Sequence, residues 1–154
     1  MNQPSKIISG GQTGADQAGL IAAKSLGIET GGHLPSNCMT ETGPNYSLVE
    51  MFGCVDSGTN YAIRTGLNVR DSDGTVRFAR TFGSPGERCT LGWIRRHKKP
   101  YFDVDMQDPP HIEVFQKWIL DNNIQVLNVA GNSESRAPGI LDFVIDYLIR
   151  SLSR

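Results

Sequence analysis

The segment SGGQTGAD, Ser9 to Asp16, combines residue types and spacing suited to ligand chemistry. It follows a short apolar run and precedes apolar residues at helical spacing, so it predicts a strand, a tight turn and a helix. The first N–H groups of a helix lack internal partners and carry the positive end of its dipole, so an anion fits such a turn. The spacing matches neither G-x-G-x-x-G nor the Walker motif. The residues expected to bind a ligand here are Gly10, Gly11, Gln12, Thr13, Gly14 and Asp16.

Asp16 has two interpretations. A carboxylate in the first turn of a helix stabilises the helix dipole, and that role needs no ligand. The same carboxylate could instead hold a ribose hydroxyl or act as a general base in hydrolysis. The chain offers no G-x-S-x-G elbow and no histidine cluster to support a nucleophilic triad.

The middle of the chain is basic. Residues 60–100 hold seven arginines and two lysines against three acidic residues, a net charge of +6 within a chain of net charge −1. A local cationic field on an otherwise acidic protein favours a small anionic ligand, whereas a long nucleic acid would need a broader basic face. Arg64 and Arg70 are long enough to clamp a phosphate, or else they are solvated surface residues.

No direct metal site is expected. Asp71 and Asp73 in the polar turn RDSDGT could bind a divalent ion, but the bidentate glutamate of a calcium loop is missing. Cys38, Cys54 and Cys89 are odd in number and lack C-x-x-C spacing, so neither a disulfide framework nor a zinc site is predicted. Without an apolar run of roughly 20 residues or a signal-peptide core, a soluble, cytoplasmic protein is expected.

Strands and helices alternate along the chain, which has the length of one domain, residues 1–154. Predicted strands are Lys6–Ser9, Val76–Arg80, residues 101–105 and residues 124–131. Predicted helices are Ala15–Leu26 ended by Gly27, a short one near residues 47–53, one opened by Ser84 and Pro85, one capped by Asp108, and residues 140–152. Residues 28–47 are expected to form a long loop, a candidate lid, and residues 60–75 a second irregular stretch.

This alternation predicts an α/β fold with a mainly parallel sheet covered by helices on both faces. In such sheets ligands bind outside the carboxyl ends of the strands. The segments SGGQTG, TFGSPG and AGNSES each follow a predicted strand, so three donor-rich loops should meet at the same edge. Glycine turns also occur simply because the chain must reverse direction, but three together favour a ligand cleft.

Motifs along nearly the whole chain carry a family resemblance. KIISGGQTGADQAGL, GGHLP, TETGPN, RTGLNVRDSDGT, GSPG, LNVAG and SESRAPGI occur in that order between Lys6 and Ile149. With these motifs the sequence resembles the putative molybdenum carrier family. That family is described as a circularly permuted branch of a Rossmann-like superfamily, which includes the Lonely Guy phosphoribohydrolases and the molybdenum cofactor carrier protein. The resemblance implies a three-layer Rossmann-like fold.

The resemblance also implies a phosphorylated nucleotide, or the pterin of the molybdenum cofactor, as the ligand, and a homo-oligomer as the assembly. Besides the opening turn, it implies binding residues in three further walls of the site. These are Arg64, Asn68, Asp71, Ser72 and Asp73, then Ser84 and Gly86, then Gly131, Glu134 and Ser135. Arg70, selected above as a possible phosphate clamp, completes the set of expected binding residues.

Two functions remain open from the sequence. One is a carrier that holds the ligand unchanged, which the lack of a recognisable catalytic constellation favours. The other is a hydrolase resembling the Lonely Guy enzymes, which would cleave the N-glycosidic bond of a nucleoside monophosphate, with Asp16 or Glu134 stabilising the ribosyl cation. A nucleic-acid-binding protein is not expected, because the net charge is near neutral.

Overall fold

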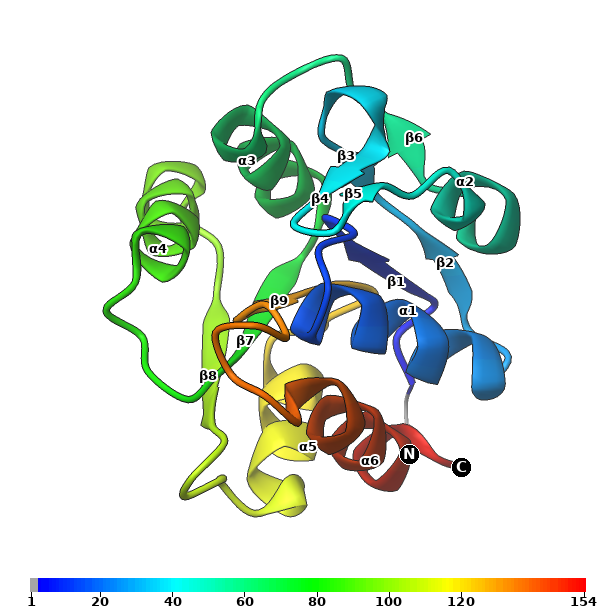
Figure 1. The fold of residues 1–154 in the computed structure, drawn as a ribbon. Coiled ribbons are helices and arrows are strands. Elements are labelled where there is room, and N and C mark those ends of the chain that lie inside the picture. Colours follow the sequence, from blue (N-terminus) through cyan, green and yellow to red (C-terminus); the bar gives the residue numbers. More distant parts are fainter. Residues whose placement is uncertain (1–2) are drawn as a thin grey trace.

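The computed structural model describes residues 3–154 and shows a parallel sheet between two layers of helices (Figure 1). Within the described residues the main sheet has five strands in the order β2-β1-β9-β7-β8, all parallel. Their bounds are β1 Lys6–Ser9, β2 Glu29–Gly31, β7 Gly74–Ala79, β8 Tyr101–Asp105 and β9 Val126–Gly131. The predicted α/β class with a mainly parallel sheet is confirmed.

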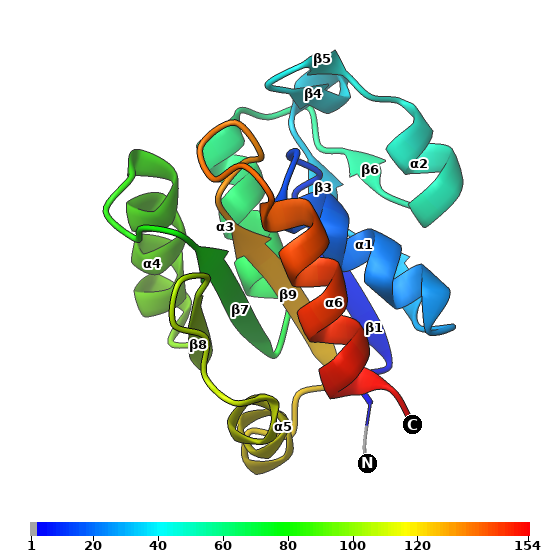
Figure 2. The same cartoon turned by 60° about the horizontal axis from the view of Figure 1, so that its bottom comes forward.

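Helices cover both faces of this sheet. Helices α3 (Tyr61–Asp71) and α4 (Pro85–His97) pack side by side on one face. Helices α1 (Ala15–Ser25), α5 (Ile112–Asp121) and α6 (Ile140–Leu152) cover the other face (Figure 2). Right-handed crossovers between parallel strands require helices on the faces, so this layering follows from the topology.

The core lies mainly between the sheet and the layer formed by α1, α5 and α6. Phe78 from β7 and Phe115 from α5 each lie against Tyr147 of α6, with ring centroids 5.6 and 5.8 Å apart. All three side chains are essentially excluded from solvent. On the opposite face of β7, buried Arg77 forms a bidentate pair with Asp103, with nitrogen–oxygen distances of 2.8 and 2.7 Å.

The segment expected to be a long loop is largely structured. Residues 29–31 form the edge strand β2, and the strands β3 (His33–Leu34) and β6 (Val55–Asp56) pair with each other. A 3-10 turn, Ser36–Cys38, leads into a small antiparallel hairpin of β4 (Met39–Thr40) and β5 (Gly43–Pro44). The short helix α2 (Ser47–Phe52) follows as predicted. Short strands of two or three residues are too brief to show a periodicity, which is why the sequence pattern missed them.

The second stretch expected to be irregular is the helix α3. Asn60 is its N-cap, and its side-chain oxygen accepts a hydrogen bond from the Ile63 amide at 2.8 Å. Gly66 in the middle weakened the helical pattern, but the glycine has a packing role. A Cβ atom there would lie 2.6 Å from the Trp93 ring, so only glycine lets α3 approach α4 this closely.

Other element boundaries also differ from expectation by a few residues. Helix α5 begins at Ile112 with His111 as its N-cap, so Asp108 and the two following prolines lie before the helix. Strand β7 runs from Gly74 to Ala79, two residues earlier at its start than predicted. Strand β9 begins at Val126 rather than at residue 124.

Two helical glycines allow the packing to be tested with the same substitution. A Cβ atom on buried Gly19 would lie 2.6 Å from the Val129 Cβ, whereas a Cβ atom on Gly92 meets nothing within 4 Å. We expect Gly19→Ala to lower the free energy of unfolding by about 1–3 kcal/mol, because overpacking outweighs the gain in helix propensity. Gly92→Ala should raise it by about 0.5–1 kcal/mol. Urea denaturation measures both changes, and equal stabilisation by the two substitutions would contradict this packing of α1 on β9.

Candidate functional site

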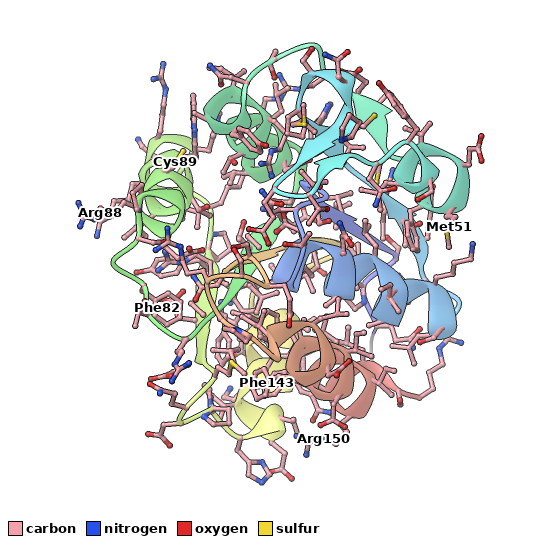
Figure 3. The ribbon with its side chains drawn as sticks, in the orientation of Figure 1. Met51, Phe82, Arg88, Cys89, Phe143 and Arg150 are labelled. Carbon is pink, nitrogen blue, oxygen red and sulfur yellow. The ribbon has the colours of Figure 1, made fainter. Side chains whose placement is uncertain are left out.

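A cleft of about 380 Å³ lies at the carboxyl edge of the sheet. Loops after β1, β7 and β9 contribute to it, as the sequence predicts, and α3 and α4 form its remaining walls. Its lining residues are Gly10, Gln12, Asp16, Tyr61, Ala62, Arg64, Thr65, Asn68, Ser84, Pro85, Gly86, Glu87, Cys89, Thr90, Asn128, Val129, Ala130, Gly131, Ser133 and Arg136. In contrast, Arg88 on α4 is exposed and points away from the sheet (Figure 3).

A buried ion pair stands in the wall of this cleft. Nη1 of Arg64 lies 3.3 Å from Oδ2 of Asp16, and both side chains are more than nine-tenths buried. The Gln12 amide donates to the same carboxylate oxygen at 3.1 Å. The guanidinium also lies over the ring of Tyr61, 5.5 Å from its centroid. The turn after β1 and the helix α3 therefore meet through opposite charges.

The first glycine of the turn makes room for this pair. A Cβ atom on Gly10 would lie 1.7 Å from Nη1 of Arg64, so a larger residue would displace the guanidinium. Gly14, which has a φ of 81°, serves a different purpose. A Cβ atom there would lie 2.6 Å from the backbone oxygen of Asn132, so this glycine lets the turn pack against the loop after β9.

Arg64 is short of hydrogen-bond partners. Its bond to Asp16 is long, and its Nε is buried and has no partner within the described residues. A buried, charged donor without a partner is costly, because neither water nor protein compensates its desolvation. The unused donors of the guanidinium suit an anionic oxygen.

Burial raises the pKa of Asp16 from its usual 3.8 to about 6. The charge of Arg64 and the hydrogen bond from the Gln12 amide act in the opposite direction, and the negative charge of Glu87 adds to the increase. Carboxyl groups with a pKa near neutrality, in a cleft and beside a charged partner, occur often at functional sites.

Glu87 is a second buried carboxylate in the cleft, and it was not among the residues predicted from the sequence. Its Oε2 accepts hydrogen bonds from the Ser84 hydroxyl at 2.7 Å and from the Asn132 side-chain amide at 2.8 Å. The spacing Ser84-x-x-Glu87 is that of a capping box, which was a recognisable signal at the start of α4. Tyr61 and Arg136 were also missed, and only their proximity to predicted residues could have indicated them.

The structure brings together about half of the predicted binding residues. Those that line the cleft are Gly10, Gln12, Asp16, Arg64, Asn68, Ser84, Gly86 and Gly131. Thr13, Gly14, Glu134 and Ser135 instead line a second pocket. Gly11, with a φ of 78°, packs against Leu34 and Leu48.

The predicted residues from Arg70 to Asp73 do not line either pocket. Arg70 and Asp71 form an exposed pair at 2.7 Å, and His33 lies 2.7 Å from the other oxygen of Asp71. Asp73 accepts hydrogen bonds from the amides of Gln125 and Val126, at the start of β9. Asp73 thus lies at the amino end of the sheet and holds the backbone there, whereas Arg70 and Asp71 pair with each other at the surface.

Glu134 also forms hydrogen bonds with the backbone of its own protein chain. Its carboxylate oxygens accept hydrogen bonds from the amides of Gly139 at 2.7 Å and Leu141 at 2.9 Å, at the start of α6. These bonds satisfy amides that the helix itself leaves unpaired. Between the two acidic residues selected from the sequence, Asp16 is the one in the cleft.

The described residues contain no group of three or more His, Cys, Asp or Glu side chains arranged to hold a metal ion. All three cysteines are free, and only Cys89 lines the cleft. Over residues 3–154, the helices are all too short or too polar to cross a membrane.

The sequence between residues 7 and 152 matches the model of the circularly permutated YpsA SLOG family. The chain belongs to this family. A crystal structure of a protein named putative molybdenum carrier protein, from Syntrophus aciditrophicus SB, is similar with a TM-score of 0.88 and 34% sequence identity. The similarity covers 99% of this chain and 98% of that one. No curated protein matches. The family and the Rossmann-like α/β fold expected from the sequence are confirmed.

In this family member, the raised pKa of Asp16 predicts a pH-dependent stability. Between pH 4 and 6 the folded state keeps a proton on Asp16 that the unfolded state has lost. The free energy of unfolding contributed by Asp16 therefore falls by roughly 2–3 kcal/mol as the pH rises through this window. Asp16→Asn removes this dependence. The difference in the free energy of unfolding between the parent and the variant should therefore change by roughly 2–3 kcal/mol between pH 4 and 6.

Urea unfolding from pH 3.5 to 7 measures this difference, because the contributions of other carboxylates cancel. Asp142, exposed on α6, provides the control. Asp142→Asn should not reproduce the change that Asp16→Asn produces. A constant difference between the parent and Asp16→Asn would show that burial does not raise the pKa of Asp16.

Proposed function

We propose that the protein binds a phosphorylated nucleotide or pterin-type ligand in the cleft, and that it acts as a carrier of that ligand. The observation that supports this most directly is the guanidinium of Arg64. It is buried in the cleft wall, holds Asp16 through one long bond and has a buried Nε without a partner. A phosphate oxygen in the cleft would accept from guanidinium donors that the single long bond to Asp16 leaves unused.

Other walls of the cleft fit the rest of such a ligand. Tyr61 is 43% exposed and borders the cleft, so its ring is available to stack on a flat heterocycle. Gly86, in the first turn of α4, and Arg136 add positive character. The volume of about 380 Å³ lies in the range of small-molecule sites.

The molybdenum cofactor is one member of this ligand class. The similar Syntrophus protein is named a molybdenum carrier, which makes a pterin with its phosphate a specific candidate. The donor set in the cleft suits the organic part of that cofactor, because it offers a cation, a glycine turn and an aromatic ring. It does not suit direct metal coordination, since the described residues hold no cluster of metal-ligating side chains.

The proposal predicts that Arg64→Met weakens binding of nucleoside monophosphates by about 10- to 100-fold, the range for one charge-assisted hydrogen bond. Arg70→Met removes the same charge from an exposed site on the same helix and should leave binding unchanged. Isothermal titration calorimetry with a panel of nucleoside monophosphates measures both. Mass spectrometry and elemental analysis of material that copurifies with the protein would extend the panel to a pterin.

Because Arg64→Met leaves Asp16 without its partner, the double variant Asp16→Asn with Arg64→Met removes both charges together. It should fold and should also bind weakly. If Arg64→Met or the double variant, once shown to be folded, binds as tightly as the parent, the cleft around Arg64 is not the phosphate site.

A nucleoside monophosphate hydrolase is the second candidate, and the pKa of Asp16 favours it. A carboxyl group with a pKa of about 6, beside a cation in a cleft, suits general acid–base catalysis near neutral pH. Water would add to the anomeric carbon as the bond to the base breaks, giving ribose phosphate and the free base. In this candidate Asp16 stabilises the ribosyl cation and Arg64 holds the phosphate.

The two candidates separate in an assay of base release. For a hydrolase, we expect release of free base from at least one nucleoside monophosphate, reduced at least 100-fold by Asp16→Asn and unchanged by Asp142→Asn. Liquid chromatography with absorbance detection measures the product. Binding without any base release would exclude the hydrolase for the substrates tested and leave the carrier.

A further inference from the structure

Glu87 presents one free carboxylate oxygen to the cleft. The residue is only 3% exposed, and its Oε2 is occupied by the Ser84 hydroxyl and the Asn132 side-chain amide. Its Oε1 accepts no hydrogen bond from residues 3–154. Within those residues, Nε of Arg64 is the single side-chain nitrogen or oxygen that is both sealed from solvent and unpartnered. Oε1 therefore reaches the cleft that Glu87 lines.

The carboxylate is fixed in this position by its surroundings. Glu87 lies in the first turn of α4, which Ser84 caps. Its backbone oxygen accepts a hydrogen bond from Nη1 of buried Arg77 at 2.9 Å, and Arg77 is itself anchored by the bidentate pair with Asp103. A side chain held from these sides cannot turn out to solvent, so Oε1 is preorganised toward the cleft.

Helix capping does not account for this arrangement by itself. In a capping box the glutamate accepts a hydrogen bond from the backbone amide of the N-cap residue. Within the described chain the Ser84 amide makes no such bond, and the carboxylate accepts from the Ser84 hydroxyl instead. A buried carboxylate with an unused oxygen is costly, because its charge is incompletely compensated. An O–H or N–H donor of a ligand would supply the missing bond.

The position of Glu87 indicates which part of the ligand carries that donor. Besides burial, the negative charge of Glu87 raises the pKa of Asp16, so Glu87 lies close enough to interact with the partner of Arg64. Tyr61 is far more exposed, so a heterocycle stacked on its ring lies toward the mouth of the cleft. With the phosphate on Arg64 and the heterocycle on Tyr61, the donors left for Glu87 are the hydroxyls of the sugar between them.

We propose that Glu87 is a specificity-determining residue whose Oε1 accepts a hydrogen bond from a ribose hydroxyl, so that the cleft selects ribonucleotides over deoxyribonucleotides. This inference rests on the proposed function and narrows its ligand class to phosphorylated ribosides. A hydroxyl that donates to a carboxylate forms a charge-assisted hydrogen bond. An analogue without the hydroxyl leaves the buried carboxylate unpaired, and such sites reject it strongly.

The test compares adenosine and guanosine monophosphate with their 2′-deoxy and 3′-deoxy forms by isothermal titration calorimetry. The parent should bind the ribonucleotide at least about tenfold more tightly than one of the deoxy forms. In Glu87→Gln the amide keeps an oxygen for Ser84 and Asn132 and presents an uncharged NH2 group to the cleft. The preference should therefore fall to about threefold or less. Glu113→Gln removes the same charge from an exposed position on α5 and should keep the full preference.

A second variant removes the hydrogen bond altogether. Glu87→Met has neither donor nor acceptor and should abolish the preference, and Glu87→Gln decides the question if the methionine variant does not fold. Equal binding of the ribonucleotides and both deoxy forms by the parent would overturn the proposal, as would a full preference in Glu87→Gln. An equal loss of affinity for all forms in Glu87→Gln would also overturn it, because the donor would then lie on the heterocycle.

These outcomes are separate from those for Arg64. Weaker binding in Arg64→Met, with a parent that does not distinguish ribose from deoxyribose, would support the proposed function and contradict this role of Glu87. A ribose preference that disappears in Glu87→Gln, with unchanged binding in Arg64→Met, would support the role of Glu87 and contradict a phosphate site at Arg64. If none of the nucleotides binds to the parent, both proposals are wrong.

Discussion

The charge of Arg64, placed in the interior at the carboxyl edge of the sheet, is the constraint on which the rest of the site depends. A buried guanidinium needs a counter-charge, and Asp16 supplies it from the first turn of α1. The pair can form only if the backbone beneath it carries no side chain, which explains Gly10. The helix that carries Arg64 is itself held against α4 through a second glycine, because Gly66 lets α3 pack closely against Trp93 of α4. Glycines far apart in the sequence thus serve one electrostatic arrangement.

Carboxylates of the chain satisfy most of the donors that the glycine loops present. Asp16 accepts from the Gln12 amide, Glu41 from Thr13 and Ser135, and Glu134 from amides at the start of α6. Donor-rich loops are therefore not the same as unoccupied anion sites, because carboxylates of the chain already accept these hydrogen bonds. Asp16 and Glu134 lie near their donors in the sequence, whereas Glu41 comes from a separate hairpin. What distinguishes Arg64 is that its counter-charge leaves a buried Nε without a partner in the described chain. Within this cleft, an unmet hydrogen-bonding requirement is a sharper indicator of ligand binding than a count of glycines and hydroxyls.

Much of this arrangement could be predicted from the sequence, because parallel topology converts chain order into position. Loops that follow strands reach the carboxyl edge, and Gly10, Ser84 and Gly131 accordingly lie in one cleft. The same rule places residues that precede a strand at the opposite edge. Asp73 directly precedes β7, so its structural role at the start of β9 was accessible from topology, although its polar turn resembled a binding motif. Helix α3 could not be predicted in this way. Gly66 weakens the helical pattern in its sequence, and the reason for this glycine, its contact with Trp93, is visible only in the structure. Glu41 was equally hidden, because its partners lie 28 and 94 residues away in the sequence.

If the cleft binds an anion as proposed, the protonation of Asp16 would be coupled to that binding. At neutral pH a carboxyl group with a pKa of about 6 is mostly ionised, and it neutralises Arg64. An anion that engages the guanidinium adds negative charge beside Asp16 and weakens the interaction that holds its pKa down. The pKa of Asp16 must then rise, and binding of the anion takes up a proton. By linkage, protonation of Asp16 and binding of the anion favour each other to the same extent, so binding strengthens as the pH falls. A protonated Asp16 would also donate a hydrogen bond to the ligand, so the residue that balances Arg64 in this structure would become a second donor for the anion that replaces it.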